Sequence, residues 1–300
     1  MKILLLGANG QVGWQLRRSL CVIGDVTALH RGSTSLCGDL GRPDDLAKTV
    51  QALAPDVIVN AAAYTAVDKA ESEPDVASAI NANACAVLAE SAQRCGAWLV
   101  HYSTDYVFDG SGRQPWRESD PTAPLNVYGA SKLAGELAVS RACERHIILR
   151  TSWVFDSWGN NFVKSILRAA ARQEELKVVS DQWGAPTRAA LIADVTAHAL
   201  RRLEPPLSGM YHLAAAGETN WHEYAVLAVA HAIECGMPLK ASPATIRAIP
   251  SAEYPQAAPR PRNSRLDTQR LRTTFSLQLP AWQDGVRAVV AELATLGAPQ

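Results

Sequence analysis

A glycine-rich turn near the start of the chain constrains the fold more than any other feature. The stretch "KILLLGANGQVGWQLRRSL" joins an apolar run, the glycines Gly7, Gly10 and Gly13, and an amphipathic run. The apolar run predicts a buried strand, and the segment after the glycines predicts a helix. Such a turn lets the backbone bend tightly and approach a pyrophosphate at the helix N-terminus. The sequence therefore favours a dinucleotide site over turn glycines that bind no ligand.

Strand-like and helix-like segments alternate after this turn. The expected strands are 2–7, 25–30, 56–63, 97–105 and 146–154. The expected helices are 11–20, 46–55, 76–96 and 128–142. This alternation is typical of βαβ units on a parallel sheet, and right-handed crossovers then give a doubly wound Rossmann-type α/β fold.

The regular alternation fades after residue 155. Helices are expected at 160–175, 191–203, 265–275 and 279–296, and strands at 176–187 and 209–217. Prolines and arginines cluster without periodicity between residues 238 and 265. We therefore predict an NAD(P)-binding Rossmann domain at 1–155 and a mainly substrate-binding domain at 156–300, some segments of which return to the first.

Composition excludes several classes of protein. Hydrophobic residues make up 48% and charged residues 19% of the 300 residues, which indicates a globular chain rather than a disordered one. Lys+Arg and Asp+Glu are both 29, so no basic surface for nucleic acid or membrane is expected. The six cysteines are scattered, which favours reduced thiols in the cytoplasm, and the histidines lack metal-binding spacing.

The end of the second expected strand indicates which dinucleotide binds. Folds specific for NAD usually carry Asp or Glu there for the ribose hydroxyls. This chain has His30 and Arg31 instead, and no carboxylate before Asp39. Because arginine can pair with a 2′-phosphate, we expect NADPH to be preferred and NADH to be usable. The alternative is that Arg31 is only a solvated loop residue.

Tyr128 and Lys132 are four residues apart in "LNVYGASKLAGE". The residues after them favour a helix, and residues at i and i+4 share one helix face. Taken alone, such a pair is often surface packing. Together with the glycine turn, it suggests a catalytic phenol beside an ammonium group.

Several longer motifs give the chain a family resemblance. In order along the sequence they are "DVIVNAAAYTAVDKAESEP", "HYSTDYVFDG", "PLNVYGASKLAGE", "RTSWVF", "GNNF", "DQWGAPT" and "RPRNSRL". With the glycine turn and the Tyr–Lys pair, they resemble the extended short-chain dehydrogenase/reductase superfamily, and more closely the dTDP-4-dehydrorhamnose reductase family. The resemblance runs from residue 1 to about residue 290. It implies hydride transfer to the C4 carbonyl of dTDP-4-dehydro-L-rhamnose, the last step of dTDP-L-rhamnose synthesis.

The resemblance also implies roles for individual residues. It makes Tyr128 the proton donor, Lys132 its partner and Thr104 the hydroxyl of a catalytic triad. The implied substrate contacts are Thr104, Asp105 and Trp153. The cofactor contacts expected from the turn, from Arg31 and from the resemblance are Gly7, Gly10, Gln11, Val12, Gly13, Arg31, Asp39, Leu40, Ala62, Ala63, Tyr64, Thr65, Tyr102, Tyr128 and Lys132.

Some of these assignments have plain structural alternatives. Asp105 can be a loop cap, and Trp153 can be core packing at the end of a strand. The loop arginines either meet the nucleotide diphosphate or form a solvated basic loop; they are Arg260, Arg262 and Arg265.

The chemistry of ketone reduction supports the Tyr–Lys assignment. Hydride addition builds negative charge on the carbonyl oxygen, so a nearby group must donate a proton or a strong hydrogen bond. A free tyrosine, with a pKa of about 10, is a weak donor near neutrality. We expect the Lys132 ammonium to lower the pKa of Tyr128 and to bind the nicotinamide ribose. Thr104, at the end of the fourth strand, lies where open α/β sheets carry their sites.

Two other readings remain open. One is another nucleotide-sugar enzyme of the superfamily, such as an epimerase, which would retain its NAD between turnovers. A dehydratase usually needs a further acid/base pair, and "STDYVF" offers only Asp105. The other is a catalytically silent NADP-binding regulatory subunit, for which loss of the Tyr–Lys pair would be the clearest sign.

The chain departs from its family at positions linked to metal. Some members resembling it pair through magnesium held by glutamates, and the corresponding positions here are Gln15, Ala190 and Glu292. Mg²⁺ prefers carboxylate oxygens, so one surviving carboxylate argues against a tight site. We expect no metal, and a monomer or weak homodimer.

Overall fold

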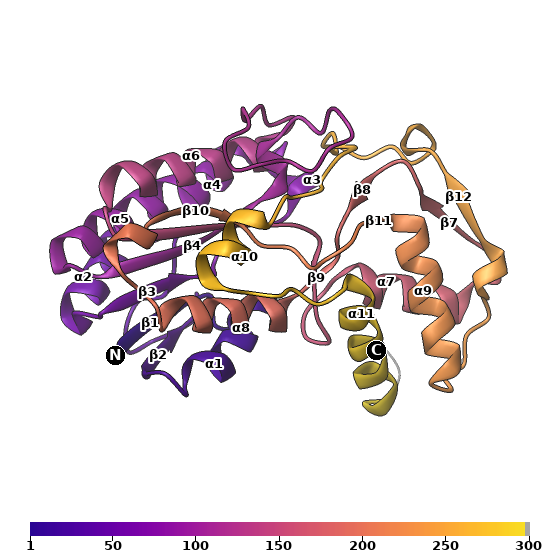
Figure 1. Cartoon of the computed structure of the whole chain (residues 1–300), viewed down its shortest axis with the longest axis horizontal. Helices are drawn as coiled ribbons and strands as arrows, with labels where there is room; N and C mark the ends of the chain where they lie inside the picture. Colours follow the sequence, from indigo (N-terminus) through magenta and orange to yellow (C-terminus); the bar gives the residue numbers. More distant parts are fainter. Residues whose placement is uncertain (298–300) are drawn as a thin grey trace.

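A parallel sheet forms the first half of the molecule. The structure is a computed structural model that describes residues 1–297. Its largest sheet has six parallel strands in the order β10-β5-β4-β3-β1-β2 (Figure 1). The strands are β1 Lys2–Leu6, β2 Asp25–Leu29, β3 Val57–Asn60, β4 Trp98–Thr104, β5 His146–Thr151 and β10 Gly209–His212. The predicted doubly wound Rossmann-type fold is confirmed.

Helices cover both faces of this sheet (Figure 1). On one face lie α2 Pro43–Leu53, α5 Ala84–Cys95 and α6 Val127–Ala142, and on the other lie α1 Gln11–Leu20, α8 Ala189–Leu200 and α10 Gln269–Phe275. Successive strand residues point to opposite faces. In β1, Leu4 and Leu6 therefore join the core under α2 and α5, whereas Ile3 and Leu5 join the core under α1 and α8.

The helix predicted at 76–96 has a π-helical turn in its first half. It consists of α4 Pro74–Ser78, the turn Ala79–Asn83 and then α5, and α3 Val67–Ala70 precedes it. The turn carries the buried Asn81, whose Oδ1 accepts from Tyr64 N at 2.8 Å and whose Nδ2 donates to Ser131 Oγ at 3.0 Å. Single π turns often occur near functional sites. This one fixes the loop after β3 to α6.

The second half of the molecule surrounds a core of its own (Figure 1). Its helices are α7 Phe162–Arg172, α9 Trp221–Glu234 and α11 Trp282–Thr295. Its short strands are β6 Val154–Phe155, β7 Leu176–Val179, β8 Trp183–Gly184, β9 Thr187–Arg188, β11 Thr219–Asn220 and β12 Ile246–Ile249. The sequence analysis assigned no element to the segments of α9 and β12. β12 lies inside the Pro- and Arg-rich stretch and pairs with β7.

Three elements after residue 155 pack with the large sheet. β10 pairs with β5, α8 packs on α1, and α10 contributes Leu271 and Phe275 to the same core. The division into a Rossmann domain at 1–155 and a mainly substrate-binding domain at 156–300 stays a proposal, with these three as the returning segments.

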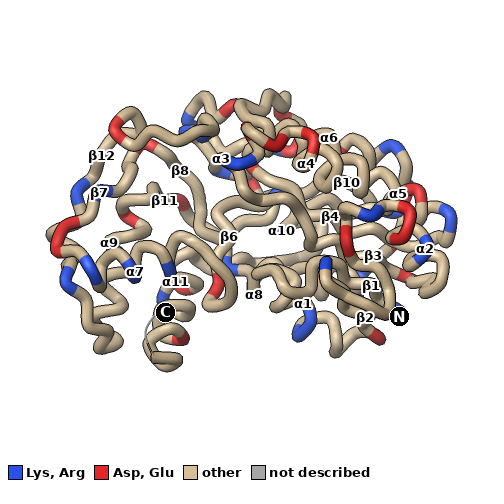
Figure 2. Tube along the Cα trace, turned by 180° about the vertical axis from the view of Figure 1, so that it is seen from behind, with Lys and Arg blue, Asp and Glu red and all other residues tan. Residues whose placement is uncertain are grey.

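Charged residues are spread over the molecule. In Figure 2, Lys and Arg alternate with Asp and Glu around the periphery of both halves, and no single sign dominates a large region. This distribution agrees with the net charge of zero. Within residues 1–297, no helix combines the length and apolar character that crossing a bilayer requires.

Candidate active site

A cavity of about 930 Å³ lies at the carboxyl ends of the sheet strands. It is lined by Gly7 after β1, Ala62 after β3, Thr104 at the end of β4 and Thr151 at the end of β5. Ligands of open α/β sheets bind at this edge. Tyr128 and Lys132 line the same cavity. The structure thus brings the glycine turn and the Tyr–Lys pair together.

Close backbone packing explains two of the turn glycines. Gly7 has a φ of 80°, and a Cβ there would lie 2.6 Å from Ala62 N. A Cβ on Gly13 would lie 2.0 Å from Gly7 O, so only glycine lets α1 approach the turn this closely. Gly10 differs, because its Cβ would meet Gly7 O at 3.4 Å, an ordinary contact. The lack of a side chain at Gly10 instead leaves room on the cavity side, where the pyrophosphate of a dinucleotide would approach the main chain.

Most of the predicted cofactor residues line this cavity. They are Gly7, Gly10, Gln11, Val12, Arg31, Asp39, Leu40, Ala62, Ala63, Thr65, Tyr102, Tyr128 and Lys132. Gly13 and Tyr64 are not among the lining residues. Gly13 is buried under the turn, and the Tyr64 hydroxyl is turned away to donate to Glu73 Oε2 at 2.8 Å.

Tyr102 faces the cavity with its backbone rather than with its ring hydroxyl. The phenol lies on the side of α8, where its oxygen is 2.7 Å from Thr196 Oγ1. Its carbonyl oxygen accepts a 2.6 Å hydrogen bond from Lys132 Nζ. A contact between Tyr102 and a cofactor would therefore be made by its main chain.

Arg31 is exposed and lines the cavity. It follows β2, where this fold is expected to bind the adenosine of a dinucleotide. Within residues 1–297, its guanidinium has no ion-pair partner. Asp39 also lines the cavity, but its Oδ1 accepts from Gly41 N at 2.9 Å. Arg31 is thus available for a phosphate, whereas Asp39 is already used in a turn.

The structure reverses the expected direction of the Tyr128 pKa. Burial raises the pKa of Tyr128 to about 12, although a hydrogen bond with Thr104 acts in the opposite direction. The expected lowering by Lys132 is absent from this arrangement, because the Lys132 amine is directed at the backbone of β4. Lys132 can lower the phenol's pKa only after its amine turns towards the cavity.

Thr104 and Asp105 are adjacent and buried at the cavity floor. Thr104 Oγ1 donates to Asp105 Oδ1 at 3.2 Å and accepts from Tyr106 N at 3.2 Å. Within the described chain, Asp105 Oδ2 is buried without a hydrogen-bond partner. Burial raises the pKa of Asp105 to about 7, and the nearby Ser264 and Thr104 hydroxyls partly oppose that rise. One oxygen of Asp105 thus lies at the cavity floor without a partner in the described chain.

Trp153 forms one wall of the cavity with a residue that the sequence analysis missed. Its ring stacks on Trp221 at a centroid distance of 3.7 Å, and both rings line the cavity. A Cβ on Gly184 would lie 2.7 Å from the Trp153 ring, which explains the glycine of "DQWGAPT". Trp153 also has a φ of 48°, a strained value for a residue other than glycine. Trp221 begins α9, the helix that was not predicted.

The loop arginines do not line the cavity. Arg260 pairs with Asp68 at 2.8 Å, and Arg265 pairs with Glu218 at 3.1 Å. Arg262 has a 74% exposed side chain and lies 4.0 Å from Asp181. A diphosphate contact by Arg260 or Arg265 would require that arginine to leave its carboxylate, whereas Arg262 is only loosely paired.

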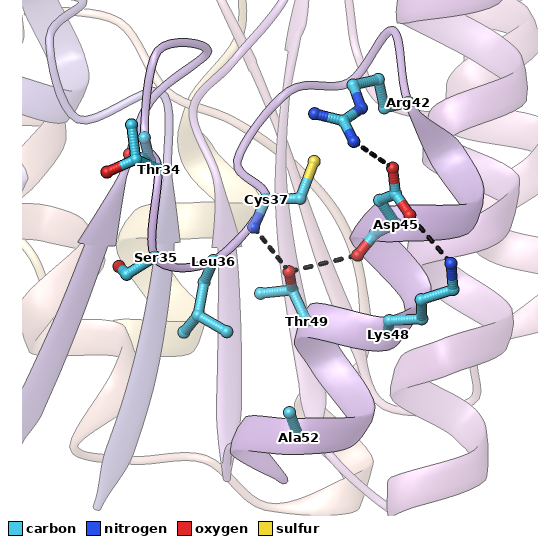
Figure 3. A pocket seen from close by; sticks show the side chains of 10 residues that line it. Thr34, Ser35, Leu36, Cys37, Arg42, Asp45, Lys48, Thr49 and Ala52 are labelled. Carbon is cyan, nitrogen blue, oxygen red and sulfur yellow. Dashed lines mark hydrogen bonds and ion pairs between the residues drawn. The ribbon is translucent and has the colours of Figure 1, made fainter.

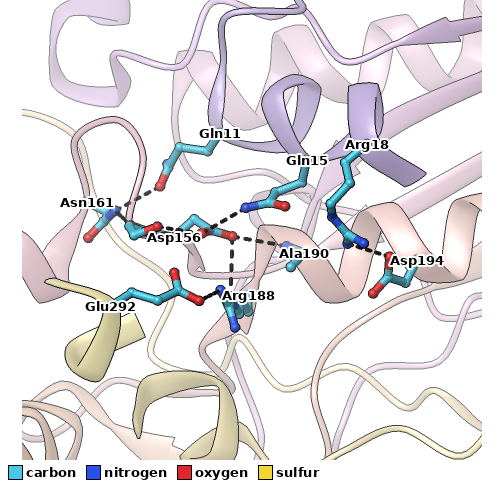
Figure 4. Close-up of polar contacts among 10 residues, drawn as sticks. Gln11, Gln15, Arg18, Asp156, Asn161, Arg188, Ala190, Asp194 and Glu292 are labelled. Carbon is cyan, nitrogen blue, oxygen red and sulfur yellow. Dashed lines mark hydrogen bonds and ion pairs between the residues drawn. The ribbon is translucent and has the colours of Figure 1, made fainter. Parts of the chain in front are cut away.

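The positions linked to metal in the family form an internal ion-pair cluster (Figure 4). Gln15 Nε2 donates to Asp156 Oδ1 at 3.1 Å, and Ala190 N donates to Asp156 Oδ2 at 3.1 Å. Arg188 pairs with Asp156 at 3.7 Å and also with Glu292. Within residues 1–297, no group of three His, Cys, Asp or Glu side chains could hold a metal ion.

A second cavity of about 340 Å³ lies between the loop after β2 and α2 (Figure 3). Its two cationic side chains, Arg42 and Lys48, both pair with Asp45, at 2.5 and 2.9 Å. Cys37 N donates to Thr49 Oγ1 at 3.0 Å. These groups satisfy one another, so this cavity offers no reacting group.

Comparisons with known proteins agree with this site. The model of the family described as RmlD substrate binding domain matches residues 1–295. The chain is 52% identical over 297 residues to the dTDP-4-dehydrorhamnose reductase of Escherichia coli (strain K12), covering 98% of this chain and 99% of that relative. It is 49% identical over 301 residues to the dTDP-4-dehydrorhamnose reductase of Burkholderia thailandensis, covering 98% and 99%. The crystal structure of the Bacillus anthracis dTDP-4-dehydrorhamnose reductase in complex with NADP has a TM-score of 0.87 at 34% identity, covering 97% and 99%.

The parallel sheet, the glycine turn and the Tyr–Lys helix define an oxidoreductase of the extended short-chain dehydrogenase/reductase class. Within that class, the full-length matches decide the family. The chain belongs to the dTDP-4-dehydrorhamnose reductase family, and the resemblance inferred from the sequence is confirmed.

The turn glycines should separate a packing role from a ligand role. Gly13→Ala should lower the free energy of unfolding by on the order of 3 kcal/mol or more, because its Cβ would overlap a backbone oxygen that cannot move aside. Gly10→Ala should leave that free energy within about 1 kcal/mol of wild type and weaken NADPH binding instead. Urea unfolding and NADPH titration measure the two effects. Equal unfolding free energies for both variants would contradict this assignment.

Asp105→Asn should stabilise the fold increasingly as pH rises. The folded pKa of about 7 lies above the ordinary value of 3.8, so the buried carboxylate destabilises the fold above pH 3.8, and fully above pH 7. The gain should be about 2 kcal/mol at pH 5 and about 4 kcal/mol at pH 8. Urea unfolding at both pH values measures it.

Asp109→Asn is the matched control for this prediction. The hydrogen bond from Ser111 N lowers the pKa of Asp109, so its carboxylate stabilises the folded state. The control should gain no stability at pH 8. A gain from Asp105→Asn that does not change between pH 5 and pH 8 would rule out the buried carboxylate as its cause.

Proposed function

We propose that this chain catalyses the NAD(P)H-dependent reduction of the C4 ketone of dTDP-4-dehydro-L-rhamnose to dTDP-L-rhamnose. The main support is that Tyr128, Thr104 and the glycine turn line one cavity, in a chain 52% identical to the Escherichia coli reductase. The direct test is NADPH oxidation with dTDP-4-dehydro-L-rhamnose, followed by identification of the product. No substrate-dependent oxidation would contradict the proposal.

The residues of the cavity suit proton delivery to a carbonyl oxygen. The bound nicotinamide would supply the hydride to C4. Because burial raises its pKa to about 12, Tyr128 keeps its proton at neutral pH and can donate it to the C4 oxygen. Thr104 offers a second hydroxyl at the same point. Lys132, once its ammonium turns into the cavity, would stabilise the phenolate and bind the ribose.

The substrate's sugar would lie between these residues and the Trp153–Trp221 wall. Small-molecule sites usually combine apolar or aromatic walls with a few directed polar groups. Asp105, with its free Oδ2, would contact a sugar hydroxyl. A nucleotide sugar is therefore the partner proposed, with no role for nucleic acid or a membrane surface.

An epimerase is the alternative with the same machinery. It would purify with tightly held NAD, whereas a reductase exchanges NADPH for NADP at each turnover. A silent regulatory subunit is disfavoured, because Tyr128 and Lys132 are both present and line the cavity. A cytoplasmic location is proposed on the basis of free cysteines throughout the described chain.

Tyr128→Phe should retain the fold and the affinity for NADPH but lose most turnover. Loss of a positioned proton donor typically costs about 10²–10⁴-fold in kcat. Steady-state kinetics with the nucleotide-sugar substrate measures kcat, and fluorescence titration measures cofactor binding. A kcat near the wild-type value would remove Tyr128 as the proton donor.

Arg31→Ala should raise KM for NADPH by about tenfold or more, because a charge-assisted hydrogen bond is worth roughly 1.5–3 kcal/mol. KM for NADH should stay nearly unchanged, since NADH has no 2′-phosphate. Arg42→Ala is a matched control, because the Arg42 guanidinium is already paired with Asp45. Equal changes for both cofactors would leave Arg31 as a solvated loop residue.

The protein should bind no Mg²⁺ tightly and should remain active in EDTA. Arg188 already pairs with Asp156 and Glu292 (Figure 4), and Gln15 and Ala190 add no negative charge. A monomer or weak homodimer is proposed. Sedimentation velocity with and without Mg²⁺ tests this, and a metal-dependent shift from monomer to dimer would contradict it.

A further inference from the structure

A buried histidine that the proposed reaction does not use lies directly behind Lys132. His101 is in the middle of β4 and is 0% exposed. Its Nε2 is 3.4 Å from Lys132 Nζ, and its Nδ1 is 3.3 Å from Asn60 Nδ2. Asn60, His101 and Lys132 therefore form a continuous buried row from β3 to the cavity.

The orientation of Asn60 fixes which nitrogen of His101 carries the proton. Ala62 N donates to Asn60 Oδ1 at 3.2 Å, so the amide oxygen is committed to the backbone. The amide nitrogen faces His101 Nδ1 at 3.3 Å and can only donate, whereas the Cys85 thiol is farther away at 3.9 Å, so we assign Nδ1 as an acceptor. Burial lowers the pKa of His101 well below its ordinary value, so the ring is neutral. Its single N–H is therefore on Nε2.

This N–H points at the Lys132 nitrogen. An ammonium has three donors and no lone pair, so it cannot accept from His101. A neutral amine can accept from His101 Nε2 and still donate to Tyr102 O at 2.6 Å. In this position the hydrogen-bond pattern suits an amine better than an ammonium.

The other groups around Lys132 supply no free negative charge. Burial raises the pKa of Cys85 to about 11, so this neighbour is a thiol. Glu136 is on the same helix, but Arg150 binds both of its carboxylate oxygens at 2.7 and 2.8 Å. Tyr128, one turn before Lys132, is a protonated phenol. Burial accordingly lowers the pKa of Lys132, and Cys85 and Glu136 only partly oppose this.

We propose that His101 is a positioning residue that, in the tautomer set by Asn60, holds Lys132 against β4 as a neutral amine until the cofactor binds. When the cofactor ribose draws the lysine into the cavity, the amine takes one proton from the solvent and becomes the ammonium that assists Tyr128. The inference rests on the proposed function, because it assumes that Lys132 meets a nicotinamide ribose. No bond other than this N–H is made or broken.

Proton uptake on cofactor binding tests the proposal. NADH is titrated calorimetrically at pH 8 into the full chain, in buffers of different ionisation enthalpy. NADH is used because the 2′-phosphate of NADPH would itself titrate. The wild type should take up about one proton per NADH bound, since a single group changes its protonation.

Two substitutions replace the N–H that faces Lys132 with an acceptor, one by replacing the ring and one through the tautomer of His101. His101→Gln offers an amide that can turn its oxygen to Lys132, and Asn60→Asp accepts from Nδ1–H and so moves the ring proton off Nε2. Both should reduce the uptake to less than half of the wild-type value. Tyr128→Phe is the control and should keep the full uptake. A merely structural role would lower stability and kcat in both variants but leave the proton count unchanged.

The possible results separate clearly. Unchanged uptake in both variants, or no uptake in the wild type, overturns the role of His101. Loss of uptake in Tyr128→Phe assigns the proton to the phenol and also overturns it. If neither variant folds, the Kd of the wild type for NADH is measured as a function of pH. This Kd should rise about tenfold per pH unit at high pH. A Kd that does not change with pH overturns the proposal. NADH that does not bind at all contradicts the proposed function, and this inference then falls with it.

Discussion

The contact between the start of α1 and the turn after β1 is the constraint on which the site depends. Because Gly13 has no Cβ, α1 can approach until the Cα of Gly13 lies against Gly7 O. Gly7 in turn lies against the backbone after β3. This packing brings three chain segments to one point at the carboxyl edge of the sheet. The free N–H groups of α1 then face a cavity whose opposite wall comes from the second half of the molecule. The presence of the glycine turn and Tyr128 on one cavity depends on this contact.

Removal from water dominates the chemistry of the site. Burial is the largest cause of the pKa changes of Tyr128, Lys132 and Asp105, and each change favours the neutral form. A neutral phenol suits a reductase, because the proton donor must carry its proton before the hydride is transferred. The same burial makes an isolated ammonium costly, so a charged Lys132 needs partners in the cavity. Charge at this site is therefore expected to form with the ligand rather than before it.

The sequence predicted those features that depend on local pattern. The alternation of apolar runs placed the sheet strands, and the glycine spacing placed the cofactor turn beside Tyr128 and Lys132. The pattern could not show the direction in which the Lys132 amine points, so the predicted lowering of the Tyr128 pKa by Lys132 is absent and burial raises that pKa instead. Trp221 was missed for a different reason. It is distant in sequence from Trp153, and only the packing of α9 brings the two rings together.

The Asp156 cluster shows how one buried carboxylate can connect the two halves of the molecule. Asp156 is 0% exposed, and it accepts from Gln15 on α1 and from the first turn of α8. Arg188 carries the connection on to Glu292 on α11. A buried carboxylate without such partners would destabilise the fold, so these contacts allow Asp156 to remain buried. Gln15, Arg188 and the backbone of Ala190 already contact the Asp156 oxygens, and Gln15 lies on the same helix that begins at the cofactor turn. A cation of any other origin would have to displace Arg188 before it could use these oxygens.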